Sequence, residues 1–204
     1  MTDPGHAAER TPSKFVLRRA ATRAGLLQLG LDRFPAKGYS ATTIDDIVRG
    51  SDYTRGAFYF HFAGKEEFFL EVLRARADLR DQWWLAVRSP EVNSTDGAVI
   101  AALARLRDQT DGHPWLLLIA DFAQAATGHD EYTRTLHALY EQWIAEIASF
   151  VREMRARGCA RSGVTDDGLA EQVFAAAQGY TLHRAVYGIE GRGLVDTLVR
   201  ILQP

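Results

Sequence analysis

Hydrophobic residues recur every three or four positions along most of the chain, which is the spacing that one face of an α-helix requires. In the first such segment, apolar residues from Val16 to Phe34 lie between Ser13, which can cap a helix N-terminus, and Gly38, which suits a helix end. The same spacing predicts further helices over residues 65–88, 94–111, 114–128, 130–157, 165–187 and 191–202. No segment carries strand signals with hairpin turns, and no internal repeat is visible. The chain is therefore predicted to be all-α, with about nine helices.

Two very short helices are predicted between residues 43 and 62. Thr43-Ile44-Asp45-Asp46 has the pattern of a capping box with Asp in the reciprocal position, and it starts the first of them. Thr54 can cap the second, which ends near Phe60 or His61 because Ala63-Gly64 follows. A turn of about three residues joins the two helices, and this arrangement is a helix-turn-helix.

The second short helix contains an unusual aromatic run. Phe58, Phe60 and Phe62 alternate with Tyr59 and His61, a pattern that on its own suits a half-buried strand. The helix signals on both sides favour a helix instead. In a helix, Phe58 and Phe62 are four residues apart and can both point into a core, while Tyr59 faces outward.

Composition and charge add a division between the two ends of the chain. The 204 residues are 47% hydrophobic and 25% charged, as in an ordinary soluble globular protein. Residues 1–65 carry a net charge of +4 and residues 66–204 a net charge of −6. This asymmetry favours an anionic partner for the N-terminal part.

The expected location follows from what the chain lacks. No apolar run approaches the roughly 18 residues of a membrane span, and the N-terminus has no apolar core of a signal peptide. Cys159 is the single cysteine, so no internal disulfide can form. We expect a cytoplasmic, nucleoid-associated protein without membrane contact, in which Cys159 is an inert thiol or, alternatively, a redox switch.

The ordered residues around the helix-turn-helix resemble the DNA-binding domain of the TetR/AcrR family of bacterial regulators. The matching residues are Phe34, Gly38, Tyr39, Thr42, Thr43, Ile44, Ile47, Thr54, Gly56, Tyr59, His61, Phe62, Lys65 and Glu66. The resemblance implies a DNA-binding domain over residues 13–64 and a ligand-binding and dimerisation domain over residues 65–204. The polar residues 1–12 are predicted to be a flexible arm. Asp52 and Tyr53 depart from the family pattern, in which glycine and a small aliphatic residue are usual.

The second helix of a helix-turn-helix enters the major groove of DNA with its N-terminal residues toward the bases. Arg55 can bind guanine with two hydrogen bonds, or alternatively a phosphate. Gly56 allows the backbone to approach DNA closely, or alternatively allows a tight contact between helices. By resemblance, Tyr59 and His61 touch the DNA backbone, while Phe60 makes an apolar contact to DNA or packs sideways. The full set of candidates is Thr42, Thr43, Thr54, Arg55, Gly56, Ala57, Tyr59, Phe60, His61 and Lys65.

Lys65 and the two threonines each have a structural alternative. Lys65 stands at a predicted helix start, where the helix dipole disfavours a cation, and a bound phosphate would remove that conflict. Thr42 and Thr43 can act as caps, and a capping threonine can also donate a hydrogen bond to phosphate.

The C-terminal part is expected to form a homodimer and to bind an unknown small molecule, as the family resemblance implies. Small residues in helices 165–188 and 191–202 permit close packing across a two-fold axis, or alternatively within one chain. The candidate pocket residues are Trp83, Trp115, Ile119, Phe122, Asp121, His137, Tyr140, Trp143, Tyr180 and His183. Asp121 could attract a cationic ligand or pair with an arginine.

Enzymatic functions are not supported by any motif. The chain has no Gly-rich phosphate loop, no GxSxG motif and no Cys/His pair at zinc spacing, so we expect neither catalysis nor a metal or cofactor. The predicted function is a ligand-responsive repressor that leaves a palindromic DNA operator when a small apolar or aromatic molecule binds. The alternative is a DNA-binding protein that works through protein partners or in nucleoid organisation, without a ligand.

Overall fold

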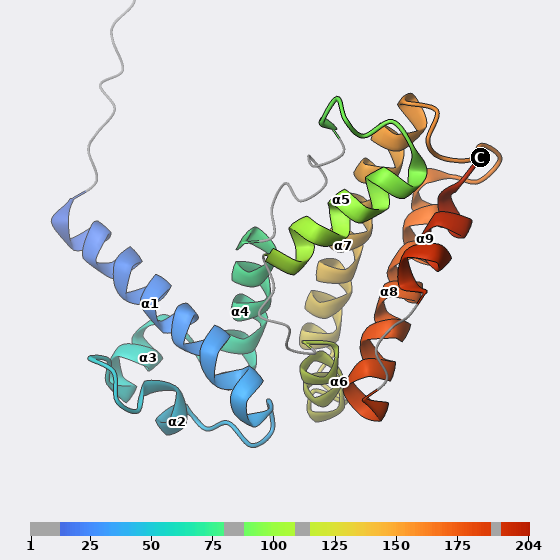
Figure 1. The fold of residues 1–204 in the computed structure, drawn as a ribbon. Helices are drawn as coiled ribbons and strands as arrows, with labels where there is room; N and C mark the ends of the chain where they lie inside the picture. Colours follow the sequence, from blue (N-terminus) through green and yellow to red (C-terminus); the bar gives the residue numbers. More distant parts are fainter. Residues whose placement is uncertain (1–12, 80–87, 109–114, 189–192) are drawn as a thin grey trace, which may run out of the picture.

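The computed structural model describes residues 13–79, 88–108, 115–188 and 193–204, and within these ranges it contains nine α-helices and no strand (Figure 1). The helices are α1 (Lys14–Lys37), α2 (Ile44–Val48), α3 (Arg55–His61), α4 (Lys65–Leu79), α5 (Thr95–Asp108), α6 (Trp115–Ala125), α7 (Asp130–Ala156), α8 (Asp166–Tyr187) and α9 (Leu194–Leu202). The predicted all-α fold class is confirmed. Among the described residues, no helix combines the length and the apolar character that a bilayer span requires.

The helix ends of the N-terminal part follow the local signals in the sequence. The Ser13 side chain accepts a hydrogen bond from the Val16 N–H, and α1 ends at Gly38, whose φ of 90° favours glycine. Thr43 and Asp46 form the complete capping box that starts α2. Thr54 caps α3 by accepting a hydrogen bond from the Ala57 N–H at 3.1 Å. The predicted helix-turn-helix is therefore confirmed.

We use the name head for α1, α2 and α3, and the name body for α4 to α9. The head is built on an aromatic cluster that extends into the first turn of α4. The cluster consists of Phe34, Tyr39, Phe58, Phe62, Phe68 and Phe69, none of them more than 2% exposed. Their rings meet mostly edge to face or tilted, with centroids 4.8–5.9 Å apart. The prediction that Phe58 and Phe62 anchor this core is confirmed.

Helices α1 and α4 approach closely because a glycine stands at their contact. A Cβ atom on Gly30 would lie 2.5 Å from Cγ2 of Val72 and 2.8 Å from Cζ of Phe68. Gly25 has a similar role for Tyr53, whose ring occupies the space that a Cβ there would need. The large side chain at position 53 is thus accommodated by a glycine on the facing helix.

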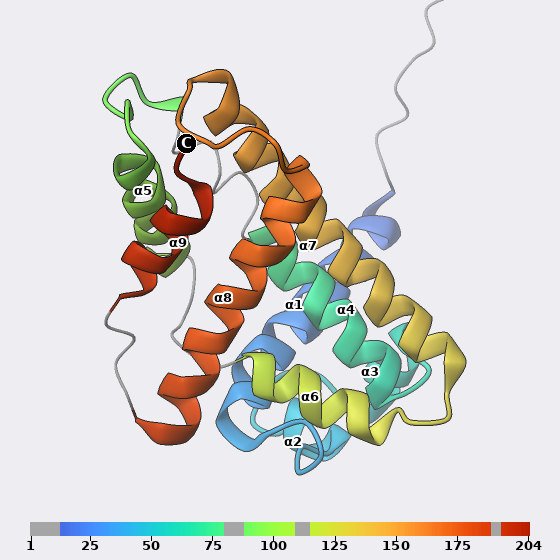
Figure 2. The same cartoon turned by 90° about the vertical axis from the view of Figure 1, so that its right-hand side faces the viewer.

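The body is a layered helical bundle in which α7 and α8 pack along each other (Figure 2). Helix α9 packs on α8 and α5, and this part has its own core around Phe150, Val151 and Met154 of α7. Helix α6 extends across to the head and contacts α1 as well as α8. The body is therefore joined to the head through α6 in addition to α4.

Some predicted helix limits differ from the structure. The last helix begins at Leu194, because Gly193 has a φ of 96° and acts as its N-cap, so the predicted start at residue 191 is wrong. The predicted extension of the helix over 65–88 falls on residues 80–87, which are outside the described residues together with Trp83. The end of the helix predicted over 94–111 also falls outside, beyond Asp108.

Candidate DNA-binding interface and ligand cavity

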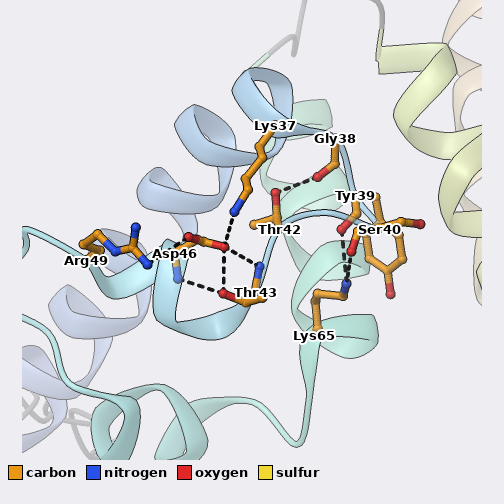
Figure 3. A network of polar contacts seen from close by, with 9 residues as sticks. All are labelled: Lys37, Gly38, Tyr39, Ser40, Thr42, Thr43, Asp46, Arg49 and Lys65. Atoms are coloured by element: carbon orange, nitrogen blue, oxygen red, sulfur yellow. Dashed lines mark hydrogen bonds and ion pairs between the residues drawn. The ribbon is translucent and has the colours of Figure 1, made fainter.

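Asp46 organises the junction between α1 and α2 (Figure 3). Its carboxylate accepts hydrogen bonds from Lys37 Nζ at 2.6 Å, from the Thr43 N–H at 3.0 Å and from the Thr43 hydroxyl at 2.7 Å. Arg49 forms a further ion pair with it at 3.2 Å. The hydrogen bond from Lys37, followed by those from Thr43, holds the pKa of Asp46 well below its usual range. The start of α2 is thus fixed to the end of α1 by an ionised carboxylate.

Thr42 and Lys65 both make internal contacts in the same region (Figure 3). Thr42 is fully buried and donates its hydroxyl hydrogen bond to the Gly38 carbonyl at 2.6 Å. Lys65 Nζ donates to the carbonyls of Tyr39 at 3.1 Å and Ser40 at 3.3 Å, and it lies 4.4 Å from the Tyr39 ring centroid. The lysine at the start of α4 is therefore satisfied by backbone carbonyls, without a phosphate.

Helix α3 presents an exposed face that is suited to DNA. Arg55, Gly56, Tyr59 and Phe60 are exposed, whereas Phe58 on the opposite side is buried. The Arg55 guanidinium lies 3.2 Å from the Asp45 carboxylate of α2, in an ion pair whose two partners both remain more than half exposed. The side chain that we predict to read a base is thus held at the surface by a neighbour in the same motif.

Gly56 has no packing role in the described structure. A Cβ atom at this position would meet only Thr54 Oγ1, at 3.6 Å, which is an ordinary van der Waals distance. A tight helix–helix contact, the alternative explanation for a glycine here, is therefore wrong for the described residues. Glycine has a low helix propensity, so its presence in the first turn of α3 agrees with the predicted close approach of the backbone to DNA.

Phe60 and His61 lie beside two arginines of α1. Cζ of Arg19 lies 5.3 Å from the Phe60 ring centroid, and Cζ of Arg23 lies 5.4 Å from the Phe62 ring centroid. Burial, and then the charges of Arg19 and Arg23, lower the pKa of His61 from its ordinary value. This lowering favours the neutral form of the His61 ring.

The body encloses a cavity of about 290 Å³ between α4, α5, α6, α7, α8 and α9. Trp115, Ile119 and Trp143, from the set predicted to bind ligand, line this cavity. The other lining residues are Leu73, Arg76, Val99, Ala102, Leu103, Leu116, Glu146, Ile147, Phe150, Val173, Phe174, Ala177, Gln178, Thr181, Arg184, Leu194, Leu198 and Leu202. Apolar walls with a few polar groups are typical of small-molecule sites.

Two further predicted residues belong to the contact between α6 and the head and do not line the cavity. Phe122 is completely buried, with its ring centroid 5.1 Å from that of Tyr39 and 5.0 Å from that of Phe69. Asp121 accepts hydrogen bonds from the Ser40 N–H at 2.8 Å and from the Ser40 hydroxyl. Burial acts to raise the pKa of Asp121, but the hydrogen bonds from Ser40 and the charge of Lys65 outweigh it and hold the pKa below its usual range.

The remaining predicted ligand residues lie on α7 and α8 but are not among those that line the cavity. His137 is exposed and lies 3.6 Å from the Glu141 carboxylate. Tyr140 packs against Phe174, a lining residue, with ring centroids 5.7 Å apart. The Tyr180 hydroxyl is hydrogen-bonded to Thr197 at 2.9 Å. His183 is exposed and packs against Tyr187, with ring centroids 5.8 Å apart.

The polar members of the cavity wall were missed by sequence reasoning. Gln178, Thr181 and Arg184 recur every three residues along α8, which brings them to one face of that helix. Arg76 lies with its guanidinium carbon 4.8 Å from the Trp115 ring centroid. The three-residue spacing along α8 was a signal in the sequence, but only the fold reveals that this face is turned inward.

Helix α6 takes part in both the cavity and the head. Trp115 and Ile119 line the cavity, whereas Asp121 and Phe122 contact the head through Ser40 and Tyr39. A change of the cavity wall that displaces this 11-residue helix would therefore also displace its contacts with the head. Among the described residues, no group of three or more His, Cys, Asp or Glu side chains could hold a metal ion.

Comparisons with known proteins agree with this architecture. Residues 26–72 match the model of a family described as bacterial regulatory proteins, tetR family. The chain is 25% identical over 178 residues to the HTH-type transcriptional repressor DhaR of Mycobacterium sp., covering 83% of this chain and 85% of that protein. It is 29% identical over 171 residues to the transcriptional regulator AcuR of Cereibacter sphaeroides, covering 77% and 73%. The crystal structure of the regulatory protein TetR from Rhodobacter sphaeroides shares the fold, with a TM-score of 0.68, 23% identity, and coverage of 89% and 98%. The segment that holds the capped helix-turn-helix, residues 26–72, thus belongs to the tetR family of bacterial regulatory proteins, and the chain is similar to transcriptional regulators along most of its length.

Proposed function

We propose that the chain is a transcriptional repressor whose homodimer binds a palindromic DNA operator and leaves it when a small apolar or aromatic molecule enters the body. The observation that carries this proposal is the position of α6, which lines the cavity at Trp115 and Ile119 and contacts the head at Asp121 and Phe122. A ligand that binds one conformation of the cavity better than another shifts the population of head positions by its difference in affinity.

The DNA-binding part of the proposal rests on the exposed face of α3. The α3 N-terminus is held by the Thr54 cap, and Arg55, Gly56 and Tyr59 are all exposed in that helix. Arginine with two hydrogen bonds to guanine is the commonest specific contact in the major groove. Thr43, Thr54, Ala57 and His61 remain candidates for contacts with the DNA backbone. Thr42 and Lys65 have internal partners that explain their presence equally well.

The dimer is proposed to form through α8 and α9. Leu182, Val186 and Tyr187 are exposed on α8, and Val186 and Tyr187 are more than half exposed. Nothing lies within 4 Å of a Cβ built on Gly179 of the same helix, so a second chain could approach closely there. Because one head reads one half-site, a two-fold dimer would place two heads on a palindromic operator.

Binding of the variant Arg55→Ala to operator and to random DNA tests the base-reading role. We expect it to lose discrimination between operator and random DNA by about 1–3 kcal/mol per head, because a bidentate base contact disappears. Asp45→Asn is the matched control, because it removes the ion pair but keeps the guanidinium, and it should retain the discrimination. Equal losses for operator and random DNA in Arg55→Ala would show that Arg55 contacts only phosphate.

The alternative of a nucleoid or partner-binding protein is not favoured, because relatives that align along most of the chain are named a transcriptional repressor and a transcriptional regulator. Genome-wide mapping of binding sites with the native protein separates the two functions. A regulator should occupy few sites next to promoters, and binding spread over the whole genome would contradict the proposal. The division at residues 64 and 65, the arm over residues 1–12 and the cytoplasmic location stay predictions.

A further inference from the structure

Positive charge in the head is concentrated on the first half of α1. Residues 14–24 contain Lys14, Arg18, Arg19 and Arg23 and no acidic residue. The cations around α2, in contrast, have acidic partners. Lys37 and Arg49 both pair with Asp46, and Arg55 pairs with Asp45. An anion that approaches the head therefore meets positive charge without acidic neighbours in the sequence beside the start of α1.

Arg19 and Arg23 occupy similar positions over aromatic rings but differ in their partners. The Arg23 guanidinium lies over Phe62, which is buried, and it also forms an ion pair with Glu71 of α4. The Arg19 guanidinium lies over Phe60, which is 61% exposed, and no carboxylate of the described residues lies within ion-pair distance of it. The charge of Arg23 is neutralised by Glu71, whereas the exposed Arg19 remains available to an external anion.

The position of Phe60 on α3 determines where Arg19 lies. Phe60 is four residues after Gly56, so the two share one side of α3, next to the side that carries Arg55 and Tyr59. Arg19 thus stands at the α1 edge of the face that we propose for DNA. Phosphates border the groove that a recognition helix enters, so an outward cation at this edge is placed for one of them.

We propose that Arg19 binds a DNA phosphate beside the recognition helix, and that Phe60 is the positioning residue that holds its guanidinium there. This inference rests on the proposed function, because it needs α3 to enter the major groove. A phenylalanine cannot donate a hydrogen bond to phosphate, and its ring face instead orients the arginine that can.

The salt dependence of DNA binding by the full-length dimer tests the proposal. The probe is a duplex recovered by selection with the wild-type protein from random sequences. Arg19→Ala should reduce the slope of log K against log salt concentration by about 0.9 per head, or about 1.8 for a dimer on two half-sites. Arg105→Ala on α5 removes an exposed arginine of the body and should leave the slope unchanged.

A double-mutant cycle tests the role of Phe60. Phe60→Leu keeps an apolar side chain but removes the ring face, and it should weaken binding about two- to fivefold per head in the presence of Arg19. In the Arg19→Ala background the same change should have almost no effect, since there is no guanidinium to position. Phe60→Tyr keeps the ring face and should bind DNA with the wild-type affinity.

Each outcome separates this inference from the proposed function. An unchanged salt slope in Arg19→Ala, with wild-type protein that still binds the selected duplex, overturns the inference and leaves the regulator function intact. Additive effects in the cycle overturn the positioning role of Phe60. If the wild-type protein selects no duplex, both proposals fail. Thermal melting of every variant shows whether a loss of binding reflects unfolding, and a folded Arg19→Ala with a flatter slope supports the phosphate contact.

Discussion

In the head, six aromatic rings pack against one another with none more than 2% exposed, whereas several aromatic side chains of the body surround a cavity of about 290 Å³. The two regions draw on the same residue types. In the head, edge-to-face contacts leave little freedom, because any shift of one ring displaces several others. In the body, Trp115, Trp143 and Phe174 each have one side on open space.

The difference corresponds to what each region must do. Reading a DNA groove requires side chains at fixed positions, and a close-packed cluster under α3 supplies such a support. A cavity for a small molecule requires walls that can adjust to an occupant, which unfilled space allows. Helix α6 belongs to both regions, because Phe122 packs into the aromatic cluster and Ile119 lines the cavity. Helix α4 has the same double role, because Leu73 lines the cavity and Phe68 packs in the cluster, so a change in the body can reach the head through α4 and α6.

The largest expected effect comes from emptying the aromatic cluster. Phe68→Ala should lower the free energy of unfolding by about 3–5 kcal/mol, since the ring is fully buried and touches Phe34, Phe58 and Phe62. Phe174→Ala, at the half-buried cavity wall, is the matched control and should cost less than half of that. Urea denaturation of both variants gives the comparison. Equal losses would mean that the two regions are packed alike.

A smaller effect is expected from the glycine between α1 and α4. Gly30→Ala should lower the free energy of unfolding by about 1–3 kcal/mol, because its Cβ would lie 2.5 Å from Val72 and 2.8 Å from Phe68. Gly56→Ala is the control in the same region, where the Cβ meets only Thr54 at 3.6 Å, and it should not lower the free energy of unfolding. Thermal and urea unfolding measure both. A destabilised Gly56→Ala variant would contradict the open environment of that residue.

The head could be predicted from the sequence because local rules determine most of it. Thr43 and Thr54 cap N–H groups three residues away, and the spacing of Phe58 and Phe62 indicates a shared helix face. The contacts of Tyr53 with Gly25 and of Asp121 with Ser40 could not be predicted in this way. They join residues that are distant in the chain, and Asp121 lies 81 residues from Ser40.

The cavity was predictable only in outline. Aromatic richness indicated a pocket in the body, and Trp115, Ile119 and Trp143 do line one. Whether an aromatic residue lines a cavity or fills a core depends on how several helices are rotated relative to one another. Phe122 is three residues from Ile119 on α6, yet it points into the aromatic cluster of the head. Periodicity identifies the buried face of a helix but not the space that this face meets.

A substitution at Asp121 removes the hydrogen bonds between α6 and Ser40 of the head. Asp121→Ala should lower the free energy of unfolding by about 1 kcal/mol at pH 7, because the Ser40 N–H and hydroxyl lose their acceptor. The folded-state pKa of Asp121 is depressed, so its contribution is present above the unfolded value of about 3.9 and is lost as the pH falls through the folded value. The difference between variant and wild type in urea denaturation should therefore shrink in acid. A difference that persists unchanged at low pH would show that the carboxylate charge does not matter.

The smallest expected effect is a change in the pKa of His61, the last residue of α3. Its folded-state pKa is lowered by burial first and by Arg19 and Arg23 second, so Arg19→Ala should raise the pKa of His61 toward 6.5 without reaching it. NMR titration of the His61 ring protons measures this pKa, and Arg105→Ala should leave it unchanged. Because the unfolded chain takes up this proton at a higher pH than the folded chain, the contribution of His61 to stability is present above about pH 6.5 and declines as the pH falls through the folded value. If Arg19→Ala leaves the pKa of His61 where it was, the Arg19 guanidinium does not rest beside α3 in solution. The cation–π contact between Arg19 and Phe60 would then be absent in solution, and Phe60 could not position the Arg19 guanidinium.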